Sequence, residues 1–245
     1  MQKLVYLFVL SVGLFSCKGE KALELTVEDI DNYVNEKLGP DQIYDVGQSL
    51  RFSRDEETYE VVRYVQEDTV ILYLETHTTA QEQVVRQTFF KEGLPVFIDE
   101  YISSNVAEEP FMQRKVYLDG SSIMECHERK SASEFDLEYM EFAEGDVSLD
   151  AYDFDKPGNA MEQIGEFELK FEEFLNIPPQ KYMILENESS KYNVALFVSD
   201  EPNELITTFE LDPEAHKGKT VFITHQFILM NGIERMLFVA GKVAE

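Results

Sequence analysis

The chain has 245 residues, of which 48 are acidic and 21 basic, so its formal net charge at pH 7 is −27. This balance argues against nucleic acid as a partner, because phosphate contacts need clustered Lys and Arg, and it disfavours docking by charge onto anionic lipid headgroups. The 44% of hydrophobic and 12% of aromatic residues can supply one large core or two modest ones, and two cysteines are too few for a disulfide framework.

The N-terminal segment 1–16 has the features of a secretory signal peptide. Lys3 gives a positive end, and the mostly apolar run 4–15 follows it. Twelve helical residues span about 18 Å, whereas the hydrocarbon core of a bilayer is about 30 Å thick. The run is therefore too short for a membrane span and fits a signal that is removed.

Residues 14–17 (Leu-Phe-Ser-Cys) resemble the lipobox of bacterial lipoproteins, which has an aliphatic residue at −3, a small residue at −1 and then cysteine. The resemblance implies that the thiol of Cys17 carries a diacylglyceryl group and that cleavage removes residues 1–16. Two or three acyl chains hold a protein durably at a bilayer. The chain is thus expected in the bacterial envelope, anchored to the outer membrane on either its periplasmic or its surface face.

Residues 17–25 are expected to form a tether, and residues 18–21 (Lys-Gly-Glu-Lys) resemble the charged tethers of surface lipoproteins in Bacteroidota. An amphipathic helix follows. Thr26 has an acid three residues on, at Asp29, as in a capping box. Apolar side chains then recur at helical spacing up to Leu38, and Gly39 with the proline after it ends the pattern.

A weak repeat follows this helix. Three segments consist of an aromatic residue, two others and Gly, and a fourth has Val and Asp at those places; in chain order they are 65–68, 90–93, 117–120 and 142–145. Gly or Asp between runs rich in Val, Ile, Tyr, Phe and Thr predicts a tight hairpin. Four hairpins predict a mainly β fold with an antiparallel eight-stranded meander within residues 26–157, either closed as a barrel or curled and covered by helices. The topology loosely resembles MORN-type hairpin repeats and other bacterial β-meander lipoproteins.

Individual strands of this meander differ in their expected surroundings. Residues 70–74 (Val-Ile-Leu-Tyr-Leu) are apolar on both faces, so this strand is expected to be covered on both sides. The segments 114–117 (Arg-Lys-Val-Tyr) and 138–141 (Glu-Tyr-Met-Glu) combine charged and apolar side chains. They are expected to be outer strands with one face in water.

Residues 158–179 are expected to be a helix and a linker. Asn159 with Glu162 can cap a helix, and apolar residues lie near one face over 159–175. Residues 167–172 also alternate strictly, as a half-buried strand would. The cap and the scarcity of β-branched residues favour the helix. Residues 177–179 (Ile-Pro-Pro) then mark a domain boundary.

Residues 180–245 are expected to form a small β domain. Asn231-Gly232 is a strong hairpin signal between its last two strands. The strand count resembles an OB-like or other small five-stranded barrel, although the excess of acidic residues argues against oligonucleotide binding. The five expected strands are 182–185, 192–199, 204–211, 220–230 and 233–244.

No motif in the chain identifies a catalytic residue, a metal site or a cofactor. Cys126 and His127 are neighbours on a strand and point to opposite faces, so we expect Cys126 to be a packing residue. His225 is expected to be buried and hydrogen-bonded. Residues 153–158 resemble the beginning of a calcium-binding loop. The last position of such a loop, which needs a bidentate Glu, would fall on Ile164.

One further modification site is predicted. Asp68-Thr69-Val70 resembles the acceptor sequence for O-glycosylation in Bacteroidota, which would place a glycan on Thr69. The alternative interpretation of the same tripeptide is the first hairpin turn of the meander.

The sequence favours a membrane-anchored, non-catalytic envelope lipoprotein held by Cys17, which binds a partner protein, a glycan or a small apolar ligand. Two alternatives stay open. One is a hydrolase that acts on envelope polymers through paired carboxylates, for which two acids in a cleft would be the sign. The other is a structural subunit of an envelope complex, for which a flat apolar patch would be the sign.

Overall fold

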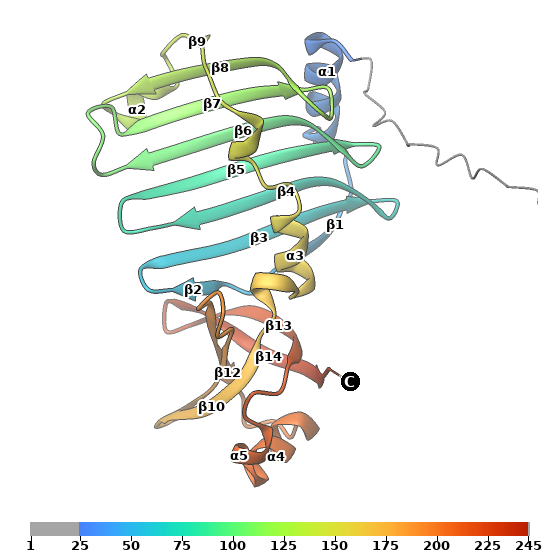
Figure 1. The fold of residues 1–245 in the computed structure, drawn as a ribbon, viewed down its shortest axis with the longest axis vertical. Helices are drawn as coiled ribbons and strands as arrows, with labels where there is room; N and C mark the ends of the chain where they lie inside the picture. The colour runs from blue at the N-terminus through green and yellow to red at the C-terminus, as the bar shows by residue number, and fades with distance from the viewer. Residues whose placement is uncertain (1–24, 245) are drawn as a thin grey trace, which may run out of the picture.

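The computed structural model describes residues 25–244, and about half of them belong to one large sheet of 14 strands (Figure 1). The main strand order is β10-β11-β12-β2-β3-β4-β5-β6-β7-β8-β9, with β1 beside β3 and with β14 beside both β12 and β13. Neighbouring strands are antiparallel except β12 and β14. The sheet is not closed into a barrel. Of the two forms expected for the meander, the open sheet covered by helices is therefore the one observed.

Strands β2 to β9 form an antiparallel meander, in which each strand pairs with the next one along the chain, and β3 to β8 correspond to predicted hairpins. Their bounds are Phe52–Arg54, Glu57–Gln66, Thr69–Thr78, Glu82–Lys91, Leu94–Ser104, Phe111–Leu118, Ile123–Ser131 and Ala143–Glu144, and β1 is Asp45–Gln48. Positive φ angles at Glu67 and Asp68, at Glu92 and Gly93, and at Gly120 make the turns. Three of the four predicted hairpins are confirmed.

The fourth predicted hairpin, at 142–145, is wrong. Residues 138–141, expected to be an outer strand, lie in the loop that follows helix α2 (Glu134–Leu137). β9 is a two-residue strand on the edge of β8, and the N–H of the next residue, Gly145, donates to the carbonyl oxygen of Cys126 over 2.9 Å. A Cβ on Gly145 would lie 3.0 Å from the Cys126 sulfur, so this glycine allows a close approach of two segments.

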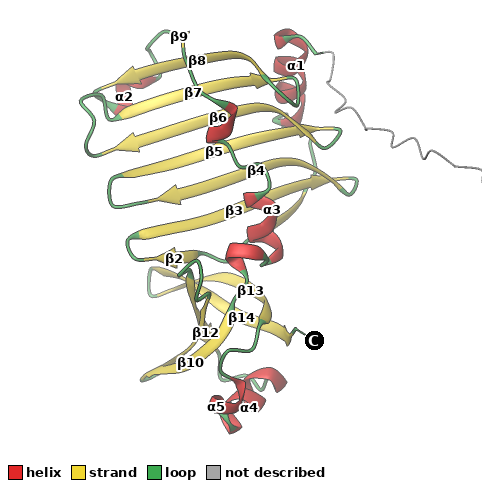
Figure 2. Ribbon diagram, viewed as in Figure 1, coloured by secondary structure: helices red, strands yellow, loops and turns green. Residues whose placement is uncertain are grey.

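The two faces of the meander are covered by different segments of the chain. Figure 2 shows their helices in red against the yellow sheet. Helix α1 (Val27–Lys37) has the expected capping box between Thr26 and Asp29. It packs on one face, against Phe97 and Tyr117 among others. Residues 145–155, here named the strap, cross the opposite face with the short 3-10 helix η1 (Leu149–Ala151) and end at α3 (Lys156–Glu162).

The strand alternation explains this division, because adjacent residues point to opposite faces. Phe97 lies on the α1 side, whereas the next residue, Ile98, packs under the strap. On β4, Leu72 belongs to the α1 cluster and Tyr73 to the main core on the other face. The prediction that residues 70–74 are covered on both faces is confirmed.

The part of the chain after the strap departs most from the expectations. The helix predicted over 159–175 is wrong, because only α3 and the turn η2 (Gly165–Phe167) are helical there and β10 (Lys170–Ile177) follows as a strand. Residues 178–179 lie in the turn between β10 and β11 (Gln180–Glu186). The strand predicted at 204–211 is also wrong. That segment is helix α4 (Glu204–Leu211), whose first turn is capped by the side chain of Asn203.

Strands β12 (Asn193–Val198), β13 (Val221–Met230) and β14 (Ile233–Val243), with helix α5 (Pro213–His216), complete the fold. Positive φ angles at Asn231 and Gly232 confirm the last predicted hairpin. β12 joins this part to the meander through its pairing with β2. The largest apolar cluster spans both parts, since Phe52 and Tyr59 share it with Leu196 and Phe209.

Within residues 25–244, no helix is both long and apolar enough to cross a bilayer. The predicted signal peptide, the lipidation site Cys17 and almost all of the predicted tether lie outside the described residues.

Candidate functional site

A stack of three aromatic rings with a cation at each end connects the meander to the C-terminal strands. The ring of Phe167 lies between Tyr59 on β3 and Tyr192, which precedes β12, with centroid distances of 5.4 and 5.3 Å and interplanar angles of 20° and 18°. The Lys156 ammonium lies 4.6 Å from the centroid of the Tyr59 ring, and the Arg54 guanidinium 4.7 Å from that of Tyr192. Stacking and cation–π attraction therefore hold α3 on β3.

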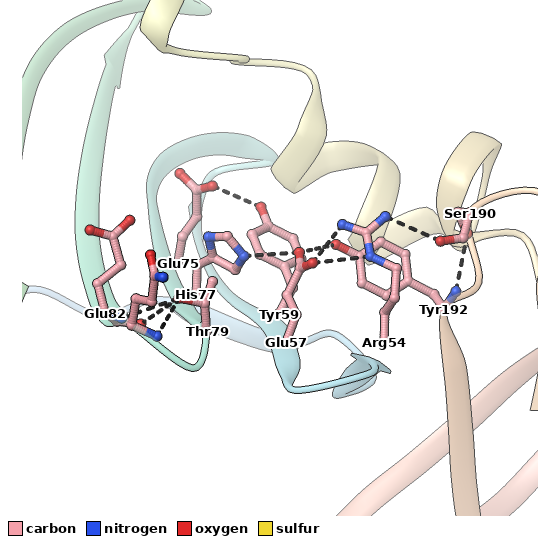
Figure 3. Close-up of polar contacts among 10 residues, drawn as sticks. Arg54, Glu57, Tyr59, Glu75, His77, Thr79, Glu82, Ser190 and Tyr192 are labelled. Carbon is pink, nitrogen blue, oxygen red and sulfur yellow. Dashed lines mark hydrogen bonds and ion pairs between the residues drawn. The ribbon is translucent and has the colours of Figure 1, made fainter. Parts of the chain in front are cut away.

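Both tyrosines of this stack donate their hydroxyls to carboxylates of the meander (Figure 3). Tyr192 donates to Glu57 over 2.9 Å, and the same oxygen lies 2.9 Å from Nε2 of His77. Arg54 binds the other oxygen of Glu57 over 2.5 and 3.0 Å. Burial acts to raise the pKa of Glu57, but these hydrogen bonds together outweigh it and lower the pKa. Glu57 is thus held as a fully partnered anion.

Glu75, one strand further, has fewer partners. Its Oε1 accepts the Tyr59 hydroxyl over 2.7 Å, while its Oε2 lies 3.8 Å from Arg86. The Glu75 residue is only 5% exposed. Burial raises the pKa of Glu75, and this effect is larger than the lowering by the charge of Arg86 and by the hydrogen bond from Tyr59. This carboxyl group therefore takes up a proton more readily than an ordinary Glu.

Glu75 begins a row of alternating charges that crosses five strands. Glu75, Arg86, Glu100, Arg114 and Glu128 stand directly opposite one another in register from β4 to β8. The central Glu100 side chain is 3% exposed and lies 2.7 Å from Arg86 and 3.2 Å from Arg114. Arg114 also contacts Glu128 over 3.4 Å. We name these five residues the charge ladder. Each buried carboxylate of the charge ladder therefore has an arginine directly opposite it on a neighbouring strand.

The strap covers the middle of the charge ladder with Tyr152. Its ring lies 5.0 Å from the Arg86 guanidinium, and the residue is 7% exposed. Burial, followed by the charge of Glu100, raises the pKa of Tyr152 to about 12, so the phenol stays protonated. Beyond it, the strap packs on an apolar cluster that includes Ile98, Val116 and Cys126. The ladder is therefore closed from water by the strap at this point.

At the end of the strap, a cleft of about 280 Å³ opens above the ladder. The strap side contributes Asp153 and Lys156, and the hairpin of β4 and β5 contributes His77 and Glu82. Within the described residues, the ammonium of Lys156 has no carboxylate within ion-pair distance. The full lining is Tyr59, Glu75, His77, Glu82, Val84, Arg86, Ala151, Asp153 and Lys156. Both charged donors and charged acceptors thus face the same small space.

Comparisons with known proteins add little to this geometry. No family model matches the chain. No curated protein matches it. The chain has a weak structural similarity to the Cpx pathway activator NlpE from Escherichia coli, whose crystal structure aligns with a TM-score of 0.20 and 9% sequence identity. The alignment covers 83% of this chain and 96% of that one.

Among the residues selected from the sequence that the structure describes, only Asp153 and Lys156 in the supposed calcium loop line the cleft. Asp153 uses one oxygen to accept the backbone N–H groups of Asp155 and Lys156. Residues 25–244 contain no group of three or more His, Cys, Asp or Glu side chains placed to hold a metal ion. Thr69 is exposed at the first residue of β4, directly after the hairpin turn.

Of the two side chains expected to be structural, Cys126 lies in an apolar cluster, whereas His225, expected to be buried, is only half-buried. Cys126 is buried, and burial raises the pKa of its thiol, which confirms it as a packing residue. Burial also lowers the pKa of His225, which lies against the backbone of Ser49. Neither residue contributes to the cleft.

The charge ladder was missed, although the sequence contains a signal for it. Arg86, Glu100, Arg114 and Glu128 alternate in sign and are evenly spaced along the chain. Counting from the hairpin turn at 92–93 would place residue 86 opposite residue 99. The register shift between Phe89 and Phe90 brings Arg86 opposite Glu100 instead. The even spacing and alternating sign therefore indicate the ladder, but its exact register depends on a bulge that the turn position does not report.

Proposed function

We propose that the chain is a lipid-anchored, non-catalytic binding protein of the bacterial outer membrane, and that the cleft beside the strap binds a small polar ligand such as a glycan. The observation that carries the proposal is the cleft lining. Glu82, Asp153 and Lys156 offer charged groups that have few or no side-chain partners, above a floor already satisfied by the charge ladder. A ligand with hydroxyl or amino groups fits such a space, because each group it brings finds a donor or an acceptor.

The same lining favours a polar ligand over an apolar one. Of its nine residues, six carry a titratable acidic or basic side chain, and only Val84 and Ala151 are apolar. Both faces of the Tyr59 ring are occupied, one by Phe167 and the other by Lys156. Recognition in the cleft thus depends on hydrogen bonds and charge, with no face of the Tyr59 ring left for stacking.

Native mass spectrometry of the lipidated protein, extracted gently from its own membrane, tests this proposal. We expect a mass increment for the lipid on Cys17 and a second increment that is lost on activation. The variants Lys156→Met and Glu82→Gln should lose the second increment and keep the first. Glu188→Gln is the matched control, because Glu188 lines a separate groove beside Arg54 and Ser190. A second increment that survives in the cleft variants contradicts this site, and a Cys17 without lipid contradicts the anchor.

A second candidate function, hydrolysis of an envelope polysaccharide, is favoured by one observation. Glu75 is a buried carboxyl group with a raised pKa, and Asp153 and Glu82 line the same cleft. A protonated acid beside a second carboxylate is the arrangement that glycoside hydrolysis uses. Incubation with purified envelope polysaccharide should then release reducing ends, and Glu75→Gln should slow the release about 100-fold or more. No release by the wild-type chain would rule this candidate out.

A further inference from the structure

A small apolar patch projects from the meander at the loop that contains α2. Phe135 is 73% exposed, Tyr139 68% and Met140 44%. The two aromatic rings contact each other with centroids 5.8 Å apart. We name these three residues the α2 patch. Large aromatic side chains that are exposed together are unusual on a surface that meets only water, and they are enriched where proteins bind proteins.

The backbone that carries the α2 patch is held in place by neighbouring elements of the sheet. Leu137, between the aromatic residues, is 4% exposed and anchors the helix. Arg129 on β8 donates to the carbonyl oxygen of Glu138 over 2.7 Å and to that of Met140 over 3.4 Å. The same guanidinium lies 4.7 Å from the centroid of the Phe142 ring. A preorganised patch loses little conformational entropy on binding.

The charges around the α2 patch determine what kind of surface can cover it. Residues 134–146 contain six acidic side chains and no Lys or Arg. A second copy of the chain would bring the same acidic rim and a net charge of −27. An anionic lipid surface would be repelled in the same way. A protein surface with an apolar pocket and a rim of Lys and Arg complements both the rings and the charge.

The patch also lies at the opposite end of the sheet strands from the contact that holds helix α1. Helix α1, which directly follows the predicted tether, packs near the turn of β5 and β6, since Tyr33 donates to the carbonyl oxygen of Phe90. The α2 patch lies beside the opposite ends of β7 and β8, where Phe111 pairs with Ser131. The eight residues of β7 alone separate the two ends by about 26 Å. A protein anchored before α1 thus holds the patch on the side remote from its tether.

We propose that the α2 patch is a docking site for a partner protein of the envelope that presents an apolar pocket rimmed by basic side chains. This interaction is separate from ligand binding in the cleft. The first test replaces Phe135 by the photo-crosslinking residue p-benzoylphenylalanine in the full chain, in its native cells. The control carries the same residue at Leu211, which is 83% exposed on α4. We expect an adduct with one protein at position 135 that is absent at position 211.

The second test uses the partner identified in that way, purified, with the purified full chain. The double variant F135A/Y139A should weaken binding at least ten-fold. Glu138→Lys should also weaken it, and so should an increase in salt from 0.05 to 0.5 M. Because both aromatic residues are exposed, the melting temperature of F135A/Y139A should stay within about 2 °C of the wild-type value. Adducts confined to lipid or to a second copy, equal adducts at both positions, no adduct, or unchanged binding by F135A/Y139A would each overturn the proposal.

Discussion

Replacing Glu100 by Gln should destabilise the protein strongly, because this carboxylate stands at the centre of the charge ladder. It lies 2.7 Å from Arg86 and 3.2 Å from Arg114. At an effective dielectric constant of 20, each contact is worth about 5 kcal/mol of Coulomb energy. Removing the charge also relieves the desolvation of Glu100 itself. Since two partly buried arginines then lose their shared partner, the expected net loss is about 3–5 kcal/mol in the free energy of unfolding.

Urea unfolding at pH 7, followed by far-UV circular dichroism, measures this loss, and thermal unfolding should show a decrease of about 6–20 °C in the melting temperature. Glu172→Gln is the matched control. Its partner is Lys217, and the two side chains are 37% and 48% exposed, so the expected loss stays below about 1 kcal/mol. Adding 0.5 M salt should abolish the control effect and leave most of the Glu100 effect. Equal losses for the two variants would refute the idea that the ladder stabilises the sheet.

Three further outcomes are expected. Burial raises the pKa of Glu75 above its ordinary value of 4.5, so the folded state binds the proton more tightly than the unfolded state. In urea titrations, the wild type should therefore lose stability relative to Glu75→Gln as the pH rises from 4.5. Gly232→Ala should lower the free energy of unfolding by about 1 kcal/mol, because residue 232 has a φ of +78°. Gly158→Ala in helix α3 should raise it by about 0.5–1 kcal/mol in the same titration, because the added Cβ meets only the Tyr73 hydroxyl at 3.6 Å. Iodoacetamide should alkylate Cys126 at least ten-fold more slowly in the folded chain than in 8 M urea, since burial raises the pKa of the thiol; equal rates measured by mass spectrometry would contradict its burial.

Hairpins with short turns could be predicted from the sequence because their signal is local. Glu92-Gly93 and Asn231-Gly232 supply two successive positive φ angles, and the strands on either side follow from that turn. The glycine at 145 gave the same signal for another reason. It leaves room for the sulfur of Cys126, a contact between segments separated in the sequence that no local pattern reports.

The sequence assigns the wrong secondary structure to two segments, with a helix expected where β10 forms and a strand expected where α4 forms. Residues 170–177 fit a helix and a strand about equally well from periodicity, and the strand wins because Phe171 becomes buried in the main core and β11 offers a full set of backbone partners. In the segment 204–211, the apolar residues favoured a strand. The hydrogen bonds from the N–H groups of Leu205 and Ile206 to the side chain of Asn203 start a helix instead.

The candidate site could be predicted only in part. The chemistry of the cleft depends on Asp153 and Lys156, which arrive over β4 and β5 from a distant part of the sequence. The strap that brings them has no regular structure beyond one short turn, so no periodicity marks its path. Its position is set by Tyr152, which fills the space above Arg86.

The place where β12 joins the meander has a consequence for the order in which the chain can fold. Consecutive hairpins of β3 to β8 need only neighbouring residues and can form before the rest of the chain is available. The edge of β2 is different, because Ser53 pairs with Asn193, which lies beyond the whole meander in the sequence. Loop closure over that distance is slow, and β2 waits with an unpaired edge until the last quarter of the chain arrives. A chain truncated before β12 would therefore leave this edge open to any strand nearby, and aggregation would be its most immediate defect.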